Sequence, residues 1–197
     1  MMKSKRILFM VEIAVFSALA FIFDVLANIV SLSLWPQGGS VSISMVPVFL
    51  MAYRWGVKGG VTTGLLLGLL QILSGTAYIM HPVQGFLDYI VAYTVVGFAG
   101  IIFKYADREK IRVRDVKTSG LVLLGVVLGS TLRFFAHFIA GMVFFGSGAA
   151  DGQSVVIFSL LYNLSYMLPS VIVSGIVMML LFAAAPRTIL RKSTYQS

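Results

Sequence analysis

Two apolar stretches of this sequence contain ionisable side chains at helical spacing. His81 and Asp88 are seven residues apart, nearly two helical turns, so they fall on similar faces of one helix. Arg133 and His137 are four residues apart and share a face of another helix. A charge at the centre of a membrane-spanning helix costs about 2.5–3.5 kcal/mol on insertion scales, so we expect these residues to serve a function.

A third helix adds an amide at the same depth. Asn163 lies about two turns into the apolar stretch 155–185, with Ser159 and Tyr166 on its face. Gly141 continues the polar face of the second helix by one more turn. Many aromatic side chains are expected in the same half of the membrane: Trp35, Tyr78, Tyr89, Phe144, Phe145, Phe158 and Tyr162.

This set of side chains suits a flat, cationic ligand. Aromatic walls favour a planar ring, and a cationic ring more strongly, through stacking and cation–π attraction. The carboxylate of Asp88 can neutralise such a cation or accept a hydrogen bond from an exocyclic amine. In the empty site we expect Arg133 to pair with Asp88. The amide of Asn163 can both donate and accept hydrogen bonds.

Simpler explanations exist for each residue taken alone. Asp88 and Arg133 could form a buried ion pair that only fixes the register of two helices. Aromatic residues near a membrane surface commonly form interfacial belts, and a single histidine is commonly a satisfied polar group. Taken one at a time, these explanations carry about the same weight as a binding role. The convergence of all these residues favours a ligand pocket.

The composition is that of an integral membrane protein. Of the 197 residues, 59% are hydrophobic and 11% are charged, and the mean hydropathy is +0.97. Long apolar runs with few charges are typical of membrane spans, and the length fits a single domain over 1–197. The sequence has no cysteine, which excludes disulfides and thiol chemistry.

Turn signals divide the chain into six predicted helices, so we expect an all-α membrane protein. The second and third helices are short for a span of about 20 residues. The start of the chain resembles a signal peptide, but its apolar run continues to Val30, so we expect a retained first helix. The predicted spans are 6–32, 43–56, 58–75, 82–103, 118–145 and 155–185.

The basic residues predict the orientation in the membrane. With six spans they all fall on one face, so by the positive-inside rule both termini are predicted to be cytoplasmic. The basic residues that give the net charge of +8 then serve to orient the protein in the membrane, with anionic lipid headgroups as their expected partner. Nucleic acid is not an expected partner. These residues are Lys3, Lys5, Arg6, Arg54, Lys58, Lys104, Arg108, Lys110, Arg112, Arg114, Lys117, Arg187, Arg191 and Lys192.

Small residues form two stripes at helical spacing. The stripe on the third span predicts close packing against another helix of this chain. It consists of Gly56, Gly60, Gly64 and Gly68. Ala14 and Ala18 repeat similarly on the first span, where internal packing and contact with a partner helix remain equally open. On that span Glu12 can reach water or pair with Arg6, and the role of Asp24 stays open.

At these residues the chain resembles the thiamin-specific substrate-binding (S) components of energy-coupling-factor (ECF) transporters. The resemblance extends over nearly the whole chain and rests on the stretches GTAYIMHPVQGFLDY, RFFAHFIAGMVFFGS and SLLYNLSY. It implies a six-helix protein of the bacterial cell membrane that captures thiamin from outside. The implied partners are a transmembrane coupling subunit, contacted by the helix of Ala14 and Ala18, and two ABC-type ATPases.

The resemblance also implies a role for each site residue. Asp88 would face the thiamin cation and its aminopyrimidine, with Tyr78 and Tyr89 lining that side. Arg133 would occupy the basic position that is paired with the acid, and His137 would stack on the ligand. The protein itself would be no enzyme and would need no cofactor or metal, and it has no GxxxxGK[ST] motif for ATP phosphates.

Three further positions complete the implied site. Gly141 would make room for the ligand, Asn163 would hydrogen-bond the pyrimidine, and Trp35 would close over the site. Four positions depart from the family pattern and bear on the affinity and the contacts. They are Asp88 where Glu can occur, Arg133 where Lys can occur, Phe145 in place of a stacking Trp, and Phe158 in place of a Tyr.

Other functions compete with this one. An enzyme or metal site could use His81, His137 and Asp88, but no HExxH or GxSxG motif is present. A stand-alone secondary transporter would usually show internal repeats, and none is clear. A structural scaffold would need no convergence of polar residues. An S component for another vitamin, or for a thiamin precursor with only the aminopyrimidine ring, would use the same acid and amide.

Overall fold

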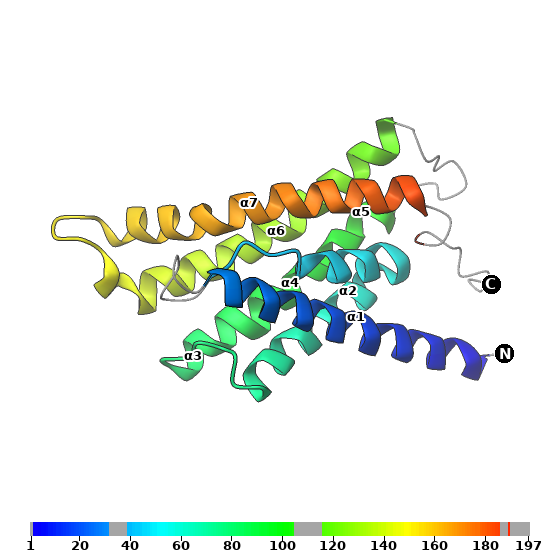
Figure 1. The fold of residues 1–197 in the computed structure, drawn as a ribbon, viewed down its shortest axis with the longest axis horizontal. Helices are drawn as coiled ribbons and strands as arrows, with labels where there is room; N and C mark the ends of the chain where they lie inside the picture. Colours follow the sequence, from blue (N-terminus) through cyan, green and yellow to red (C-terminus); the bar gives the residue numbers. More distant parts are fainter. Residues whose placement is uncertain (1, 32–38, 105–115, 186–188, 190–197) are drawn as a thin grey trace.

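The computed structural model describes residues 2–31, 39–104, 116–185 and 189, and all of its regular structure there is helical. No strand occurs within these ranges, and the helices lie roughly along one axis (Figure 1). The elements are α1 (Met2–Ser31), α2 (Met45–Leu73), α3 (Pro82–Gly85), η1 (Phe86–Val91), α4 (Ala92–Val96), η2 (Gly97–Ala99), α5 (Gly100–Lys104), α6 (Val116–Phe144), η3 (Gly146–Gly148) and α7 (Val155–Ala184).

Five helical stretches within the described residues are long and apolar enough to cross a membrane. The chain is therefore a multi-pass membrane protein, as its composition predicts. The count of six separate spans is not confirmed, because the predicted spans 43–56 and 58–75 fall within one element, α2. The five stretches are Ser4–Val30, Met45–Leu73, Pro82–Phe103, Lys117–Phe144 and Val155–Ala184.

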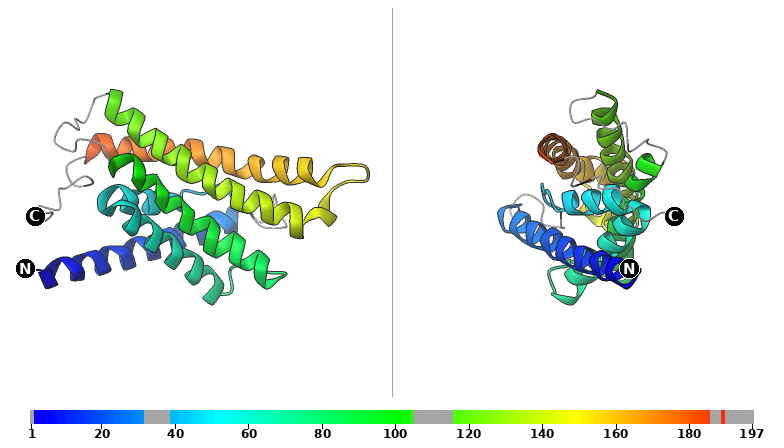
Figure 2. Two further views of the ribbon diagram at one scale, coloured as in Figure 1. Left: turned by 180° about the vertical axis from the view of Figure 1, so that it is seen from behind. Right: turned by 90° about the vertical axis from the view of Figure 1, so that its right-hand side faces the viewer.

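The element α2 bends sharply at Gly56. This residue has φ 73° and ψ −168°, a conformation that only glycine adopts readily. A Cβ placed on Gly60 would lie 2.6 Å from the Cβ of Ala52, although residues eight apart in a straight helix are about 12 Å apart. The chain therefore turns back at Gly56, so that α2 consists of two arms, 45–55 and 57–73 (Figure 2).

The glycine stripe of the second arm packs against the helix that follows it. A Cβ on Gly64 would overlap the carbonyl oxygen of Tyr93, and a Cβ on Gly68 would overlap that of Tyr89. A Cβ on Gly60 would lie 2.6 Å from the Cα of Gly97. The prediction of packing within the chain is confirmed for these three glycines and wrong for Gly56, which lies at the bend, where an added Cβ would meet nothing within 4 Å. The backbone contact fixes the depth of the segment that carries Asp88.

The helix α1 presents two different faces. Ile13, Ser17, Ala20 and Asp24 are buried against the rest of the bundle, whereas Ala14 and Ala18 are exposed. The two alanines therefore take no part in the internal packing of the described chain. This result leaves contact with a partner helix as the open explanation for their spacing.

An ion pair fastens α1 to the bend of α2. Arg54 donates from Nε and Nη2 to the two carboxylate oxygens of Glu12, each at 2.6 Å, and Trp55 Nε1 donates to Oε2 at 2.6 Å. The interpretation that Glu12 pairs with Arg6 is thus replaced by a bidentate contact with Arg54. Its cause is the turn at Gly56, which brings the end of the first arm beside α1.

The start of α1 and the end of α7 lie at the same end of the molecule (Figure 1). An aromatic core fills the bundle near this end, where Tyr53 contacts Phe103 and Phe182 with ring centroids 4.5 and 5.7 Å apart. Some basic residues used to predict the orientation lie outside the described residues: Arg108, Lys110, Arg112, Arg114, Arg187, Arg191 and Lys192.

Candidate ligand-binding site

A cavity of about 180 Å³ opens among α1, α2, η1, α6 and α7. One water molecule needs roughly 10–15 Å³ measured in the same way, so the cavity can hold a small organic molecule. Trp35 lies outside the described residues. The other predicted site residues all line the cavity, namely Tyr78, Asp88, Tyr89, Arg133, His137, Gly141, Phe145, Phe158 and Asn163.

A short π-helix presents Asp88 to the cavity. The element η1 widens the helical turn, so that the N–H of Ala92 bonds to the carbonyl of Leu87, five residues earlier. Single π-helical turns inside α-helices are frequent at functional sites. Pro82 begins the preceding turn, and the ring of His81 caps it by accepting from the N–H of Val83 at 3.2 Å.

The sequence grouped His81 with Asp88, and the structure separates them. His81 is exposed and does not line the cavity. Its ring stacks on Phe144, with centroids 5.1 Å apart and an angle of 22° between the planes. The helix start at Pro82 and the irregular turn at η1 change the faces that a regular helix would present. Of His81 and Asp88, only Asp88 therefore points into the cavity.

Asp88 is held by two neutral side chains. Gln84 Nε2 donates to Oδ2 at 2.7 Å, and His137 Nδ1 lies 2.8 Å from Oδ1. Gln84 also binds the backbone at Tyr78 and Met80, at 3.1 and 3.0 Å. Sequence reasoning gave Gln84 no role, although its position one turn before Asp88 was a usable signal.

Arg133 reaches Asp88 only through the imidazole of His137. Arg133 Nε donates to His137 Nε2 at 3.2 Å. Because a guanidinium cannot accept, Nε2 must be the acceptor, and Nδ1 carries the proton that it donates to Asp88. The predicted direct pair of Arg133 and Asp88 is therefore wrong, because His137 lies between them. The guanidinium also lies 5.0 Å from the ring centroid of Tyr93.

Asp24 is a second carboxylate of the same cavity, and its role was open from the sequence. It is buried, with 4% of its surface exposed. Gln71 Nε2 and Asn28 Nδ2 donate to Oδ2 at 2.5 and 2.8 Å, and the hydroxyl of Ser44 donates to Oδ1 at 3.3 Å. Asp24, Asn28 and Gln71 all line the cavity, so the wall of α1 and α2 is as polar as that of η1 and α6.

The α7 wall is built around Asn163. Its Nδ2 donates to the carbonyl of Ser159 at 2.9 Å, and its Oδ1 accepts from the hydroxyl of Tyr166 at 2.6 Å. A Cβ on Gly141 would overlap the hydroxyl of Ser159 and lie 3.2 Å from Asn163 Nδ2. Gly141 therefore makes room for the polar residues of α7 as well as for the cavity.

Aromatic rings close the remaining sides. The rings of Tyr78 and Phe145 stack with centroids 6.2 Å apart, and those of Phe158 and Tyr162 are 5.7 Å apart. The hydroxyl of Tyr89 accepts from the N–H of Tyr78 at 2.7 Å, which holds the loop after α2 against η1. Planar faces on several sides suit a flat ligand.

The lining charges favour a cation. Asp24 and Asp88 supply two carboxylates and Arg133 supplies one guanidinium, while the tautomer of His137 is neutral. With both carboxylates ionised, one negative charge is in excess.

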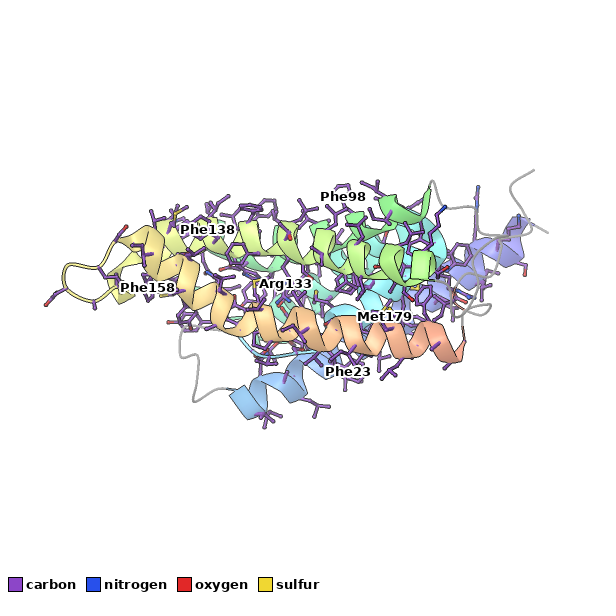
Figure 3. The ribbon with its side chains drawn as sticks, turned by 90° about the horizontal axis from the view of Figure 1, so that it is seen from above. Phe23, Phe98, Arg133, Phe138, Phe158 and Met179 are labelled. Carbon is purple, nitrogen blue, oxygen red and sulfur yellow. The ribbon has the colours of Figure 1, made fainter. Side chains whose placement is uncertain are left out.

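Arg133 lies between α6 and α7, and Phe158 lies nearer the end where the two helices connect (Figure 3). Among the described residues, no three His, Cys, Asp or Glu side chains gather to hold a metal ion.

Comparison with known proteins identifies the class. The sequence model of the thiamine transporter protein family (Thia_YuaJ) matches residues 10–190, so the chain belongs to this family. The chain is 48% identical to the thiamine transporter ThiT of Bacillus subtilis (strain 168) over 187 residues, which are 95% of this chain and 96% of that protein.

Two further relatives agree. The thiamine transporter ThiT of Lacticaseibacillus paracasei (strain ATCC 334) is 28% identical over 195 residues, 98% of this chain and 95% of that protein. The solved structure of ThiT from Listeria monocytogenes superposes with a TM-score of 0.83 at 30% identity, covering 94% of this chain and 98% of that one.

Proposed function

We propose that this protein binds thiamin and takes part in its uptake as the substrate-binding S component of an ECF transporter. The relatives are thiamine transporters by name, so the function is transport and not catalysis. The observation that supports the ligand best is the cavity, whose aromatic walls and Asp88 carboxylate complement a flat molecule with one cationic ring.

Thiamin presents an aminopyrimidine, a cationic thiazolium and a hydroxyethyl arm. In the proposed complex Asp88 faces the cation and accepts from the exocyclic amine, and Asn163 bonds to the pyrimidine. His137 stacks on the ligand, beside the other lining aromatic residues. In the structure Asn163 Oδ1 accepts from the hydroxyl of Tyr166, and the second lone pair of a carbonyl oxygen allows it to accept from the ligand as well. Trp35 closes over the bound molecule.

The proposed topology has six passages through the cell membrane with both termini in the cytoplasm. Support comes from the bend at Gly56, which divides α2 into two arms that turn back on each other. An even number of passages agrees with the position of the start of α1 and the end of α7 at one end of the molecule (Figure 1). The basic residues of the sequence support a cytoplasmic position for that end by the positive-inside rule.

Energy for transport comes from partner proteins in this proposal. Exposed Ala14 and Ala18 on α1 provide a smooth surface for a transmembrane coupling subunit, which in turn binds two ABC-type ATPases. Apolar neighbours on that face, such as Met10, Val11 and Val15, are exposed as well. Lipid is the other partner, and nucleic acid plays no part.

Two measurements separate this function from its rivals. In a competition experiment, thiamin should displace a bound aminopyrimidine alcohol at much lower concentration than the aminopyrimidine alcohol needs to displace thiamin. Tighter binding of the aminopyrimidine alcohol would identify a thiamin precursor as the ligand. In cells, uptake of labelled thiamin should disappear when the ATPase genes are deleted. Uptake that persists without the ATPases would instead identify a stand-alone transporter.

A further inference from the structure

We propose that Tyr93 is a positioning residue of the binding site, whose ring holds the guanidinium of Arg133 against His137 and thereby keeps the charge of Asp88 available to the thiamin cation. This inference rests on the proposed function and deepens it. Tyr93 lines the cavity, and it was not among the site residues expected from the sequence.

The side chain of Tyr93 is fixed at both ends. It lies on α4 and is 5% exposed. A Cβ on Gly64 would overlap the carbonyl oxygen of Tyr93, so the close contact between the two helices sets the position of its backbone. At the other end its hydroxyl forms a hydrogen bond with the side chain of Gln71, on the second arm of α2. The ring between these two anchors therefore has little freedom to move.

The ring of Tyr93 contacts both polar residues of α6. The guanidinium carbon of Arg133 lies 5.0 Å from its centroid, and the ring of His137 meets it edge-on, with centroids 6.3 Å apart and 80° between the planes. Arg133 is 9% exposed, and among the described residues no carboxylate lies within ion-pair distance of it. Because cation–π attraction is strongest where water is excluded, the ring of Tyr93 and the nitrogen of His137 hold the guanidinium in place.

The position of Arg133 decides which protonation state His137 can adopt. Because Nε of Arg133 donates to Nε2 of His137 at 3.2 Å, a proton on Nε2 would meet the N–H of the guanidinium, donor against donor. If the guanidinium moved away, Nε2 could take a proton while Nδ1 still donates to Asp88. The imidazolium formed in this way would cancel the carboxylate charge that attracts the thiamin cation.

His137 is bonded to one anion and one cation. Among the described residues, only Asp88 Oδ1 and Arg133 Nε hydrogen-bond to its ring nitrogens, at 2.8 and 3.2 Å. The titratable and charged groups of the elements packed around it are Asp24 of α1, Asp88 and Tyr89 of η1, Tyr93 of α4, Arg133 of α6 and Tyr166 of α7. Of these groups, only the two that bond to His137 act directly on its nitrogens, and Tyr93 acts through Arg133.

The test is the pH dependence of thiamin binding by the purified full chain, measured by calorimetry at about pH 7.5 and about pH 5.5, on either side of the ordinary pKa of histidine. All proteins carry His81→Asn, which keeps a capping side chain before Pro82 and leaves His137 as the only histidine. The protein with this change alone is the parent. The quantity compared is the ratio of the dissociation constants at the low and the high pH. Titration of thiamin itself is common to all variants, so a difference in this ratio reports on the protein.

Removal of the ring should make binding sensitive to pH. In Tyr93→Leu the ratio should be about tenfold larger than in the parent, because a histidine with an ordinary pKa of about 6.5 is mostly protonated at the lower pH. Tyr93→Phe is the matched control, since it keeps a ring face for the guanidinium and loses only the hydroxyl, so its ratio should match that of the parent. Arg133→Met should give the same change as Tyr93→Leu, and Tyr93→Leu should add nothing to it.

A second variant preserves the shape of the ring in case Tyr93→Leu does not fold. Replacement of Tyr93 by pentafluorophenylalanine keeps the outline of the Tyr93→Phe ring, but the fluorine atoms withdraw negative charge from its face. Its ratio should rise as that of Tyr93→Leu does. A parent-like ratio in Tyr93→Leu or in the fluorinated variant, with thiamin bound, would overturn this inference alone, as would an equal rise in Tyr93→Phe. A folded parent that binds no thiamin would overturn the proposed function with it.

Discussion

The imidazole of His137 donates from Nδ1 to Oδ1 of Asp88 at 2.8 Å, and this contact ties α6 to the π-helical turn η1 across the cavity. The opposite ring nitrogen accepts from Arg133, which fixes the neutral tautomer. The carboxylate of Asp88 is therefore held by neutral donors, and its charge remains available to a cationic ligand.

Removing that charge should weaken binding strongly. Asp88→Asn keeps the size of the side chain but abolishes its attraction for the thiamin cation, so we expect the dissociation constant to rise by about 10- to 100-fold, since a hydrogen bond to a charged group contributes about 1.5–3 kcal/mol. Calorimetry on the purified variant measures this change. Asp151→Asn, at an exposed loop position outside the cavity, should leave the affinity unchanged. Equal effects of the two substitutions would exclude Asp88 from the site.

The two tryptophans of the chain should respond differently to the ligand. Trp55 donates to Glu12 and does not line the cavity, whereas Trp35 is predicted to close over it. Thiamin should therefore change the fluorescence of the Trp55→Phe variant, which retains Trp35, but not that of Trp35→Phe. A signal that survives in Trp35→Phe and vanishes in Trp55→Phe would show that the predicted closure is wrong.

The glycine stripe should be intolerant of even one methyl group. Gly68→Ala places a Cβ on the carbonyl oxygen of Tyr89, so the helix carrying Asp88 must move away from α2. Overpacking of this kind typically costs about 1–3 kcal/mol, so the midpoint of thermal unfolding in detergent should fall clearly. Gly120→Ala is the control, because a Cβ there meets nothing within 4 Å and alanine favours the helix. If Gly68→Ala is as stable as Gly120→Ala, the close backbone contact is absent.

The exposed alanines should matter for uptake and not for binding. Ala14→Trp and Ala18→Trp add bulk to a face of α1 that contacts nothing else in the described chain. We expect the purified variants to bind thiamin with wild-type affinity and cells carrying them to lose thiamin uptake. The matched substitution Val30→Trp, at a position on α1 that is 80% exposed, should be tolerated in both assays. Normal uptake by both alanine variants would remove the proposed contact with the coupling subunit.

Helical spacing was sufficient to predict much of the site. Asp88, His137 and Asn163 were expected to converge because side chains at intervals of three, four or seven residues share one face of a helix. The structure places all three around one cavity. Periodicity could not predict which atoms meet, however, and the expected direct contact of Arg133 with Asp88 is replaced by contact through His137.

Other features left no periodic signal in the sequence. The π-helical turn at η1 lies against Gly68, where an added Cβ would overlap the carbonyl oxygen of Tyr89, and a regular helix was the only available expectation from the sequence. The amides of Gln71 and Gln84 carry no charge, so neither was given a role, although Gln84 lies one helical turn before Asp88. Their roles depend on which helices lie side by side, and the chain reversal at Gly56 decides that for α2.

The most direct test of the whole account is calorimetric titration of the purified wild-type protein with thiamin, run in parallel with His137→Ala. The account predicts saturable binding of one thiamin per chain by the wild type. It also predicts a large loss of affinity in the variant, which removes both the stacking ring and the donor that orients Asp88. A folded, monodisperse wild type that shows no heat of binding, or a variant that binds as tightly as the wild type, would contradict it.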